Sequence, residues 1–84
     1  MTADPFHRAF GEAVKEMRKE LMMSQETAAA EAGIDRCYLS ELELGKHSPT
    51  LGCIVRLAWV FGTTPSDLIR QAEKQINGNR KRNR

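Results

Sequence analysis

The 20 residues from Gln25 to Leu44 restrict the possible folds of this chain more than any other segment. Ser24 and Asp35 are residue types that cap helix N-termini, and each precedes a short helical pattern. Gly33 lies between the two patterns, where a residue with positive φ reverses the chain at little steric cost. Ala29 is small enough to let the second of these helices lie close to a neighbouring one. The segment therefore predicts two short helices joined by a tight turn and pinned together by apolar residues, namely Ala28, Ala32, Ile34, Leu39 and Leu42.

Helical patterns continue on the N-terminal side of this segment, and no alternating run of β-branched residues indicates a strand anywhere. Asp4 and Pro5 are an N-cap and a first-turn proline. They begin a first helix of about 18 residues, whose apolar stripe consists of Phe10, Val14, Met17 and Leu21. Gly11 interrupts this helix at a cost of about 1 kcal/mol relative to alanine.

Two more helices are predicted on the C-terminal side. Thr50 can cap a fourth helix, whose inward residues are Ile54, Leu57, Ala58 and Phe61. A fifth helix opens after Gly62 and turns inward Leu68, Ile69 and Ala72. Asparagine, glycine and basic residues predict a disordered basic tail over residues 77–84. Five short helices with short joints predict a compact all-α domain over residues 1–76.

The sequence offers little support for an enzyme, a metalloprotein or a membrane protein. Cys37 and Cys53 are too few for a disulfide framework, and with His7 and His47 they lack the paired spacing of a zinc site. No nucleophile, base and acid are recognisably spaced, and no glycine-rich phosphate loop occurs. No apolar run approaches the about 20 residues of a membrane span, and the N-terminus lacks a signal-peptide pattern. We therefore expect a cytoplasmic protein that is not an enzyme and needs no metal or cofactor.

The net charge of +2 does not describe a generally basic protein. Arg80, Lys81, Arg82 and Arg84 supply four of the thirteen basic side chains, which leaves nine against eleven acidic ones and a net charge of −2 for residues 1–79. Positive charge for a nucleic acid must then be placed locally. The tail itself either tracks phosphates, with an affinity that falls as salt rises, or serves only as a solubilising end.

One side of the predicted third helix has no explanation in packing. Leu39 and Leu42 turn inward, whereas chemically varied side chains point the other way, namely Arg36, Cys37, Ser40 and Glu41. A helix that enters the major groove needs this division, with an apolar side to hold it and a polar side free to meet base edges. Arg36, in the first turn of the helix, can donate two hydrogen bonds to guanine O6 and N7. Glu41 can accept a hydrogen bond from cytosine N4.

At this point the residues resemble a known family. Segment 25–44 is similar to the helix-turn-helix of phage repressors, Cro proteins and the xenobiotic-response-element (XRE) class of regulators. The resemblance extends through "SQETAAAEAGIDRCYLSELELGKHSPTLGCIVRLAWVFGTTPSDLI" and, with the first helix, covers about residues 8–70. It implies a compact five-helix lambda-repressor-like domain with its helix-turn-helix at residues 25–44.

The resemblance also implies roles for particular residues. The residues that it places on base edges are Arg36, Cys37, Tyr38, Ser40 and Glu41. The expected phosphate contacts are Gln25, Arg18, Lys46, His47 and Ser48. Arg18 and Glu43 match positions where an arginine–glutamate bridge joins the first and third helices. Leu44 departs from the pattern, because the family usually has a polar or basic residue there.

A second set of apolar residues predicts an interface between two copies of the chain. Val55 and Trp59 are one turn apart on the fourth helix and lie off its inward stripe. The fifth helix would add Leu68, Ile69, Ala72 and Ile76 to the same surface. A two-fold dimer would present its third helices about 34 Å apart, which predicts a near-palindromic operator. The alternative is that Trp59 caps the core of a monomer.

We therefore expect a homodimeric, sequence-specific regulator that binds a double-stranded DNA operator. The segment "DRCYLSELE" is similar to the recognition segment of controller proteins in bacterial restriction–modification systems. That similarity implies a controller role, including a contact with RNA polymerase, although phage repressors carry similar helices. The alternative is an antitoxin-like or other protein-binding module with the same fold.

Overall fold

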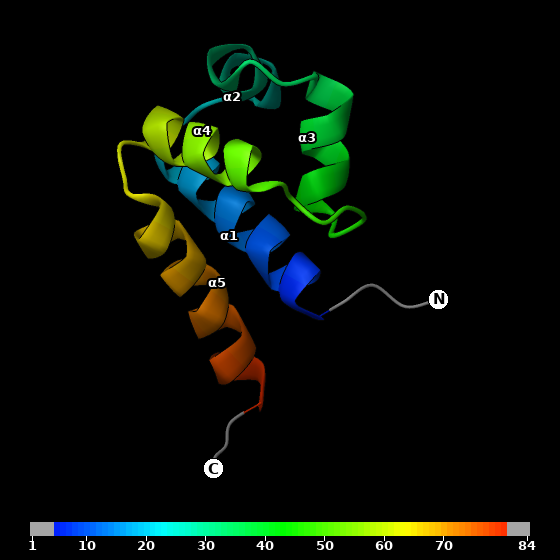
Figure 1. The fold of residues 1–84 in the computed structure, drawn as a ribbon, viewed down its shortest axis with the longest axis vertical. Coiled ribbons are helices and arrows are strands. Elements are labelled where there is room, and N and C mark those ends of the chain that lie inside the picture. The colour runs from blue at the N-terminus through cyan, green and yellow to red at the C-terminus, as the bar shows by residue number, and fades with distance from the viewer. Residues whose placement is uncertain (1–4, 81–84) are drawn as a thin grey trace.

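The protein consists of five helices with no strand in the part of the chain that the structure describes. The computed structural model describes the backbone of residues 5–80 and the side chains of residues 5–76. The helices are α1 Pro5–Glu20, α2 Gln25–Ala32, α3 Arg36–Glu43, α4 Leu51–Phe61 and α5 Pro65–Arg80 (Figure 1). The predicted all-α, five-helix fold class is confirmed.

Three helices begin directly after the residues that were predicted to cap them. The side chain of Ser24 accepts a hydrogen bond from the Thr27 backbone N–H at 3.0 Å, and Asp35 and Thr50 cap α3 and α4 in the same way. Gly33 ends α2 in the left-handed conformation with φ 73°, as the tight turn requires. The helix α3 ends at Glu43, and Leu44 is its C-cap residue.

Two helices differ in length from the prediction. The first helix ends at Glu20, after which Met22 takes a left-handed φ of 58° and its N–H donates to the carbonyl of Lys19. Leu21 falls in this turn and is 50% exposed, so its expected place in the apolar stripe is wrong. At the other end, α5 continues to Arg80 and includes residues 77–80 of the expected tail. A helix that has already formed gains one hydrogen bond for each residue added, which favours such an extension. Residues 81–84 lie outside the described residues.

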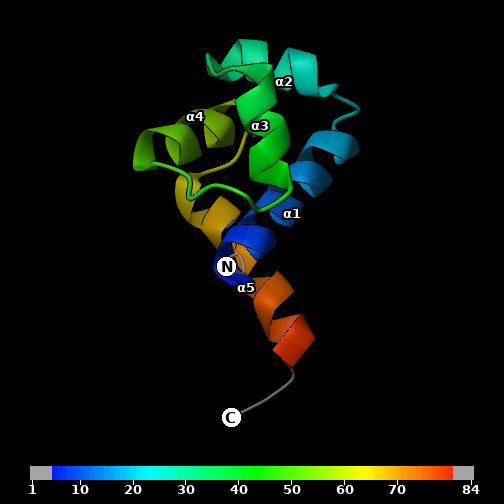
Figure 2. The same cartoon turned by 90° about the vertical axis from the view of Figure 1, so that its right-hand side faces the viewer.

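All five helices contribute residues to the core, and it supports α3 at the edge of the molecule. Its largest fully buried side chains are Phe10, Leu39, Leu42, Leu57, Leu68 and Val14. Figure 2 shows α3 in front of α1 and α4, with α2 at one end and α5 extending away from the other. This arrangement leaves the outward side of α3 uncovered by any described element.

Gly11 allows the close contact between α1 and α3. A Cβ atom at this position would collide with the backbone oxygen of Leu42 and lie 2.8 Å from the backbone oxygen of Glu43. The last turn of α3 therefore rests directly on the backbone of α1. The low helix propensity of Gly11 is the cost of this approach.

We expect Gly11→Ala to destabilise the protein by about 1–3 kcal/mol, because the backbone of α3 must move to accept the methyl group. Gly52→Ala is the matched control, since Gly52 is also a helical glycine but a Cβ there would meet only the Oγ1 atom of Thr50, at 4.0 Å. The control should be neutral or slightly stabilising, because alanine favours helix. Urea denaturation of the three proteins measures both effects, and equal stability of the two variants would contradict the proposed contact.

A buried ion pair also ties α1 to α3. The Nε of Arg18 donates to Oε2 of Glu43 at 2.7 Å, and its Nη2 donates to Oε1 at 3.1 Å. The remaining Nη1 donates to the backbone oxygen of Met23 at 2.8 Å. The structure thus contains the bridge that the family resemblance implied. Arg18 is only 8% exposed and all three of its side-chain nitrogens are engaged, which argues against its expected phosphate contact.

We expect Glu43→Gln to cost about 3–5 kcal/mol of unfolding free energy, because the Arg18 guanidinium would remain buried without a counter-charge. The double variant Arg18→Met/Glu43→Gln removes both charges and should be more stable than the single variant. Urea denaturation of the two variants and the parent protein provides the comparison. A double variant that is less stable than Glu43→Gln alone would contradict this account.

Candidate nucleic-acid interface

The outer face of α3 consists of Arg36, Cys37, Ser40 and Glu41. Three of these residues are exposed and Ser40 is half-buried, whereas Leu39 and Leu42 on the opposite side are fully buried. The amphipathic pattern read from the sequence therefore places these four residues as expected. A helix of this kind can enter the major groove of a duplex, which is about 12 Å wide.

Arg36 is held at the start of α3 by a relay of hydrogen bonds. Its Nη1 donates to Oε1 of Gln25 at 3.2 Å, and Nε2 of Gln25 donates to Oε1 of Glu43 at 3.0 Å. Because Glu43 is itself fixed by Arg18, the orientation of Arg36 is connected to the α1–α3 ion pair. Among the described residues, Gln25 accepts this one N–H of the guanidinium, and its other N–H groups remain able to donate.

Glu41 is also engaged, by a residue from the loop after α3. The Nε2 of His47 lies 2.6 Å from Oε1 of Glu41, and both side chains are about half exposed. The His47 ring stacks on the ring of Tyr38, with the ring centroids 5.4 Å apart. Sequence reasoning placed His47 on a phosphate, but in the structure it faces Glu41. The six-residue separation across a turn carries no periodic signal that could have shown this contact.

Tyr38 points inward rather than along the outer face of α3. Its ring packs against the core, and its hydroxyl interacts with Cys53 on α4. Burial raises the pKa of Tyr38, and the charge and hydrogen bond of Cys53 raise it further. Burial likewise raises the pKa of Cys53, although the Tyr38 hydrogen bond and Arg56 oppose this shift. Both groups are therefore neutral near pH 7, and the structure does not bring Tyr38 to the base-reading position expected of it.

Lys46 and Ser48 are exposed in the loop that follows α3, as expected for phosphate contacts. Arg8 of α1 lies close to Gly45 at the start of this loop. A Cβ atom at Gly45 would be 2.9 Å from the Cα of Arg8. The sequence analysis did not predict that Arg8 lies beside this loop. The signal was its position three residues before Gly11, which places both on the side of α1 that faces α3.

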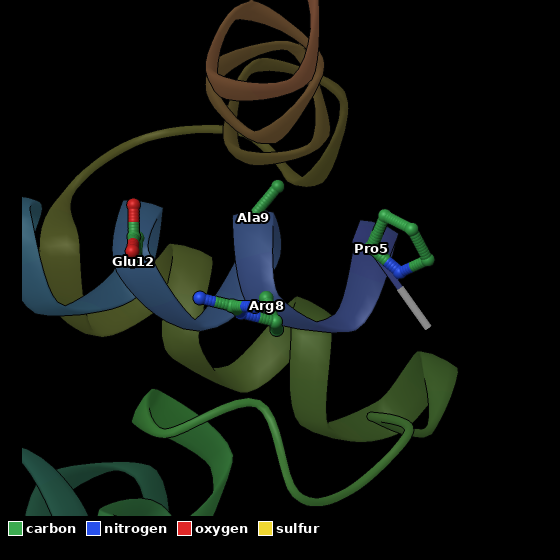
Figure 3. Close-up of a pocket in the computed structure, with 4 residues that line it drawn as sticks. All are labelled: Pro5, Arg8, Ala9 and Glu12. Atoms are coloured by element: carbon green, nitrogen blue, oxygen red, sulfur yellow. The ribbon is translucent and has the colours of Figure 1, made fainter. Parts of the chain in front are cut away.

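A small cavity of about 170 Å³ lies beside Arg8, at the start of α1 (Figure 3). It is lined by Pro5, Arg8, Ala9 and Glu12. The guanidinium and the carboxylate are its only charged groups, and they do not converge with other polar side chains on one point. The described residues contain no group of three or more side chains that could hold a metal ion.

A stripe of apolar residues follows α4 on the surface. Trp59 is 74% exposed, Leu51 is 81% exposed, and Val55 between them is half-buried. The α4 stripe, Leu51–Val55–Trp59, repeats every four residues. The prediction named Val55 and Trp59 but not Leu51, although the same spacing indicates it. The exposure of Trp59 excludes the alternative in which it caps the core.

The expected contribution of α5 to this interface is wrong for two of its four residues. Leu68 and Ala72 have no exposed surface, because they are part of the core, and α5 as a whole packs against α1 and α4. Ile69 and Ile76 are half-buried and also pack against the core. The spacing of these residues on α5 indicated one apolar face correctly, but that face is used within the monomer.

No helix among the described residues is long and apolar enough to cross a membrane.

Comparison with known proteins identifies the family. Residues 14–68 match the family model described as helix-turn-helix. Control protein C.MunI of Mycoplasma sp is 37% identical over 67 residues, which are 79% of this chain and 90% of that protein. Control protein C.BamHI of Bacillus amyloliquefaciens is 34% identical over 61 residues, which are 71% of this chain and 75% of that protein.

A solved structure agrees with both matches. The restriction-modification controller protein C.AhdI from Aeromonas hydrophila is 34% identical and superimposes with a TM-score of 0.72, over 74% of this chain and 94% of that chain. The matched region begins in α1, ends in α5 and contains the two helices and the turn that carry the outer face. The resemblance inferred from the sequence is thereby confirmed, and the chain belongs to the helix-turn-helix family of DNA-binding transcriptional regulators.

Proposed function

We propose that this regulator acts in the cytoplasm as a homodimer on a near-palindromic operator, with α3 of each copy in the major groove. Its relatives named as control proteins support a role in controlling a restriction–modification system. The observation that carries the proposal is the outer face of α3, which no described element covers and which presents hydrogen-bond donors and acceptors. A contact with RNA polymerase stays a prediction.

Three residues of the outer face have a chemistry suited to a particular base edge. Arg36 donates from its free N–H groups to guanine O6 and N7, the most common specific contact in the major groove. Glu41 accepts a hydrogen bond from cytosine N4, and Cys37 contacts the methyl group of thymine. Lys46 and Ser48 contact phosphates, which sets the register of α3 without reading sequence.

We propose that the second copy of the chain contacts the first through the α4 stripe. Few basic side chains surround α3, so one copy has a small electrostatic contribution to affinity. Two copies joined through the α4 stripe bind two half-sites about 34 Å apart. Trp59 is the side chain best suited to anchor such an interface, because exposed tryptophans bury a large area on association.

We expect Arg36→Ala to lose about 1–3 kcal/mol of preference per half-site, because alanine cannot bond guanine. Arg70→Ala is the matched control, since Arg70 is an exposed arginine paired with Asp67 on α5. Binding of both variants to a duplex selected from a random pool, and to its single-base-pair variants, measures the preference. If Arg36→Ala retains its selectivity, the base-contact assignment fails and a protein-binding module with this fold becomes the better interpretation.

We expect Trp59→Glu to convert the dimer to a monomer, because a buried unpaired carboxylate strongly disfavours association. Met22→Glu is the control, since Met22 is also exposed and apolar but lies in the turn after α1. Sedimentation equilibrium gives the mass of each variant. A parent protein that sediments as a monomer, or a Trp59→Glu variant that remains dimeric, would refute the proposed interface.

A further inference from the structure

Glu41 is held in place before any DNA is bound. It is the only carboxylate on the outer face of α3, and the Nε2 of His47 lies 2.6 Å from its Oε1 atom. A neutral imidazole with its proton on Nε2 can donate this bond, so the contact does not require a charged histidine. No hydrogen bond to Oε2 of Glu41 is formed by the described residues, which leaves this oxygen able to accept a base N–H.

His47 is itself fixed from the interior of the domain. Its ring stacks on Tyr38 at an interplanar angle of 24°, and Tyr38 packs against the core with its hydroxyl beside Cys53. Tyr38 is therefore held by contacts with the core and α4, Tyr38 restrains His47, and His47 restrains Glu41. An exposed glutamate on a helix would otherwise sample several rotamers, and a base contact would have to select one of them.

We propose that His47 is a positioning residue for base recognition, which sets the Glu41 carboxylate so that it accepts a hydrogen bond from an exocyclic amine in the major groove. The two donors of this kind are cytosine N4 and adenine N6. The inference rests on the proposed function, in which the outer face of α3 meets DNA. The proposed positioning role can be distinguished from a phosphate contact by His47, because a phosphate contact changes the affinity for all sequences alike.

The experiment begins with a duplex selected by the full chain from a pool randomised over about 20 base pairs, the span of two adjacent half-sites. Glu41→Ala identifies the base pair that Glu41 reads, as the position where discrimination is lost. His47→Ala should reduce discrimination at that same position about tenfold and leave the other positions unchanged. Tyr38→Phe retains the stacked ring and should retain the discrimination of the parent protein.

A double-variant cycle separates positioning from a general structural role. In the Glu41→Ala background, a further His47→Ala change should have no effect on discrimination at the identified base pair, because the group that His47 positions is absent. Thermal unfolding of each variant checks that the domain remains folded under the binding conditions.

The outcomes that overturn the inference are distinct from those that overturn the function. Uniform weakening of all duplexes by His47→Ala would show a phosphate contact and reject the positioning role. Unaltered discrimination in Glu41→Ala would reject it as well, while an effect of Arg36→Ala would still support DNA reading. A parent protein with equal affinity for every duplex in the pool would reject the proposed function and, with it, this inference.

Discussion

The carboxylate of Glu43 is the point on which the geometry of the site depends. It is buried at the end of α3 and accepts hydrogen bonds from Arg18 of α1 and Gln25 of α2. Three helices are thereby joined through one side chain, and both of its oxygens are used. Apolar packing alone would allow α3 to slide or rotate slightly on α1, whereas directional bonds to a buried charge permit one arrangement. The contact at Gly11 strengthens this restriction, because it leaves no space between the two backbones.

Local signals predicted the fold well because each acts within a few residues. The caps at Ser24, Asp35 and Thr50 and the glycine turn at Gly33 are set by neighbouring backbone groups, so their effect can be read without knowing the tertiary structure. The inward stripes of the helices followed from periodicity in the same way, except at Leu21, where α1 has already ended. The family pattern then related α1 to α3 through Arg18 and Glu43, a contact that periodicity cannot supply.

Predictions about surfaces were less successful, because exposure depends on how whole helices pack. The periodicity of α5 identifies an apolar face but not what covers it. In the structure α5 packs mainly against α1, and Leu68 and Ala72 are fully buried. The contact between His47 and Glu41 depends on the path of a loop, which no sequence pattern describes. The base-edge role of Tyr38 came from the family resemblance, whereas in the structure its ring packs against the core and its hydroxyl lies beside Cys53 of α4.

The outer face of α3 has charged side chains that are already partly bonded within the protein. Arg36 uses one N–H on Gln25, and Glu41 uses one oxygen on His47, which leaves part of the bonding capacity of each for a base. Ordering long side chains on binding has an entropic cost, and part of that cost is met here when the protein folds. Residues 1–79 carry a net charge of −2, so in the proposed function phosphates would contribute little and the preference for one sequence would have to come from well-placed base contacts. Restraint of Arg36 and Glu41 is the feature of the structure that supports such contacts.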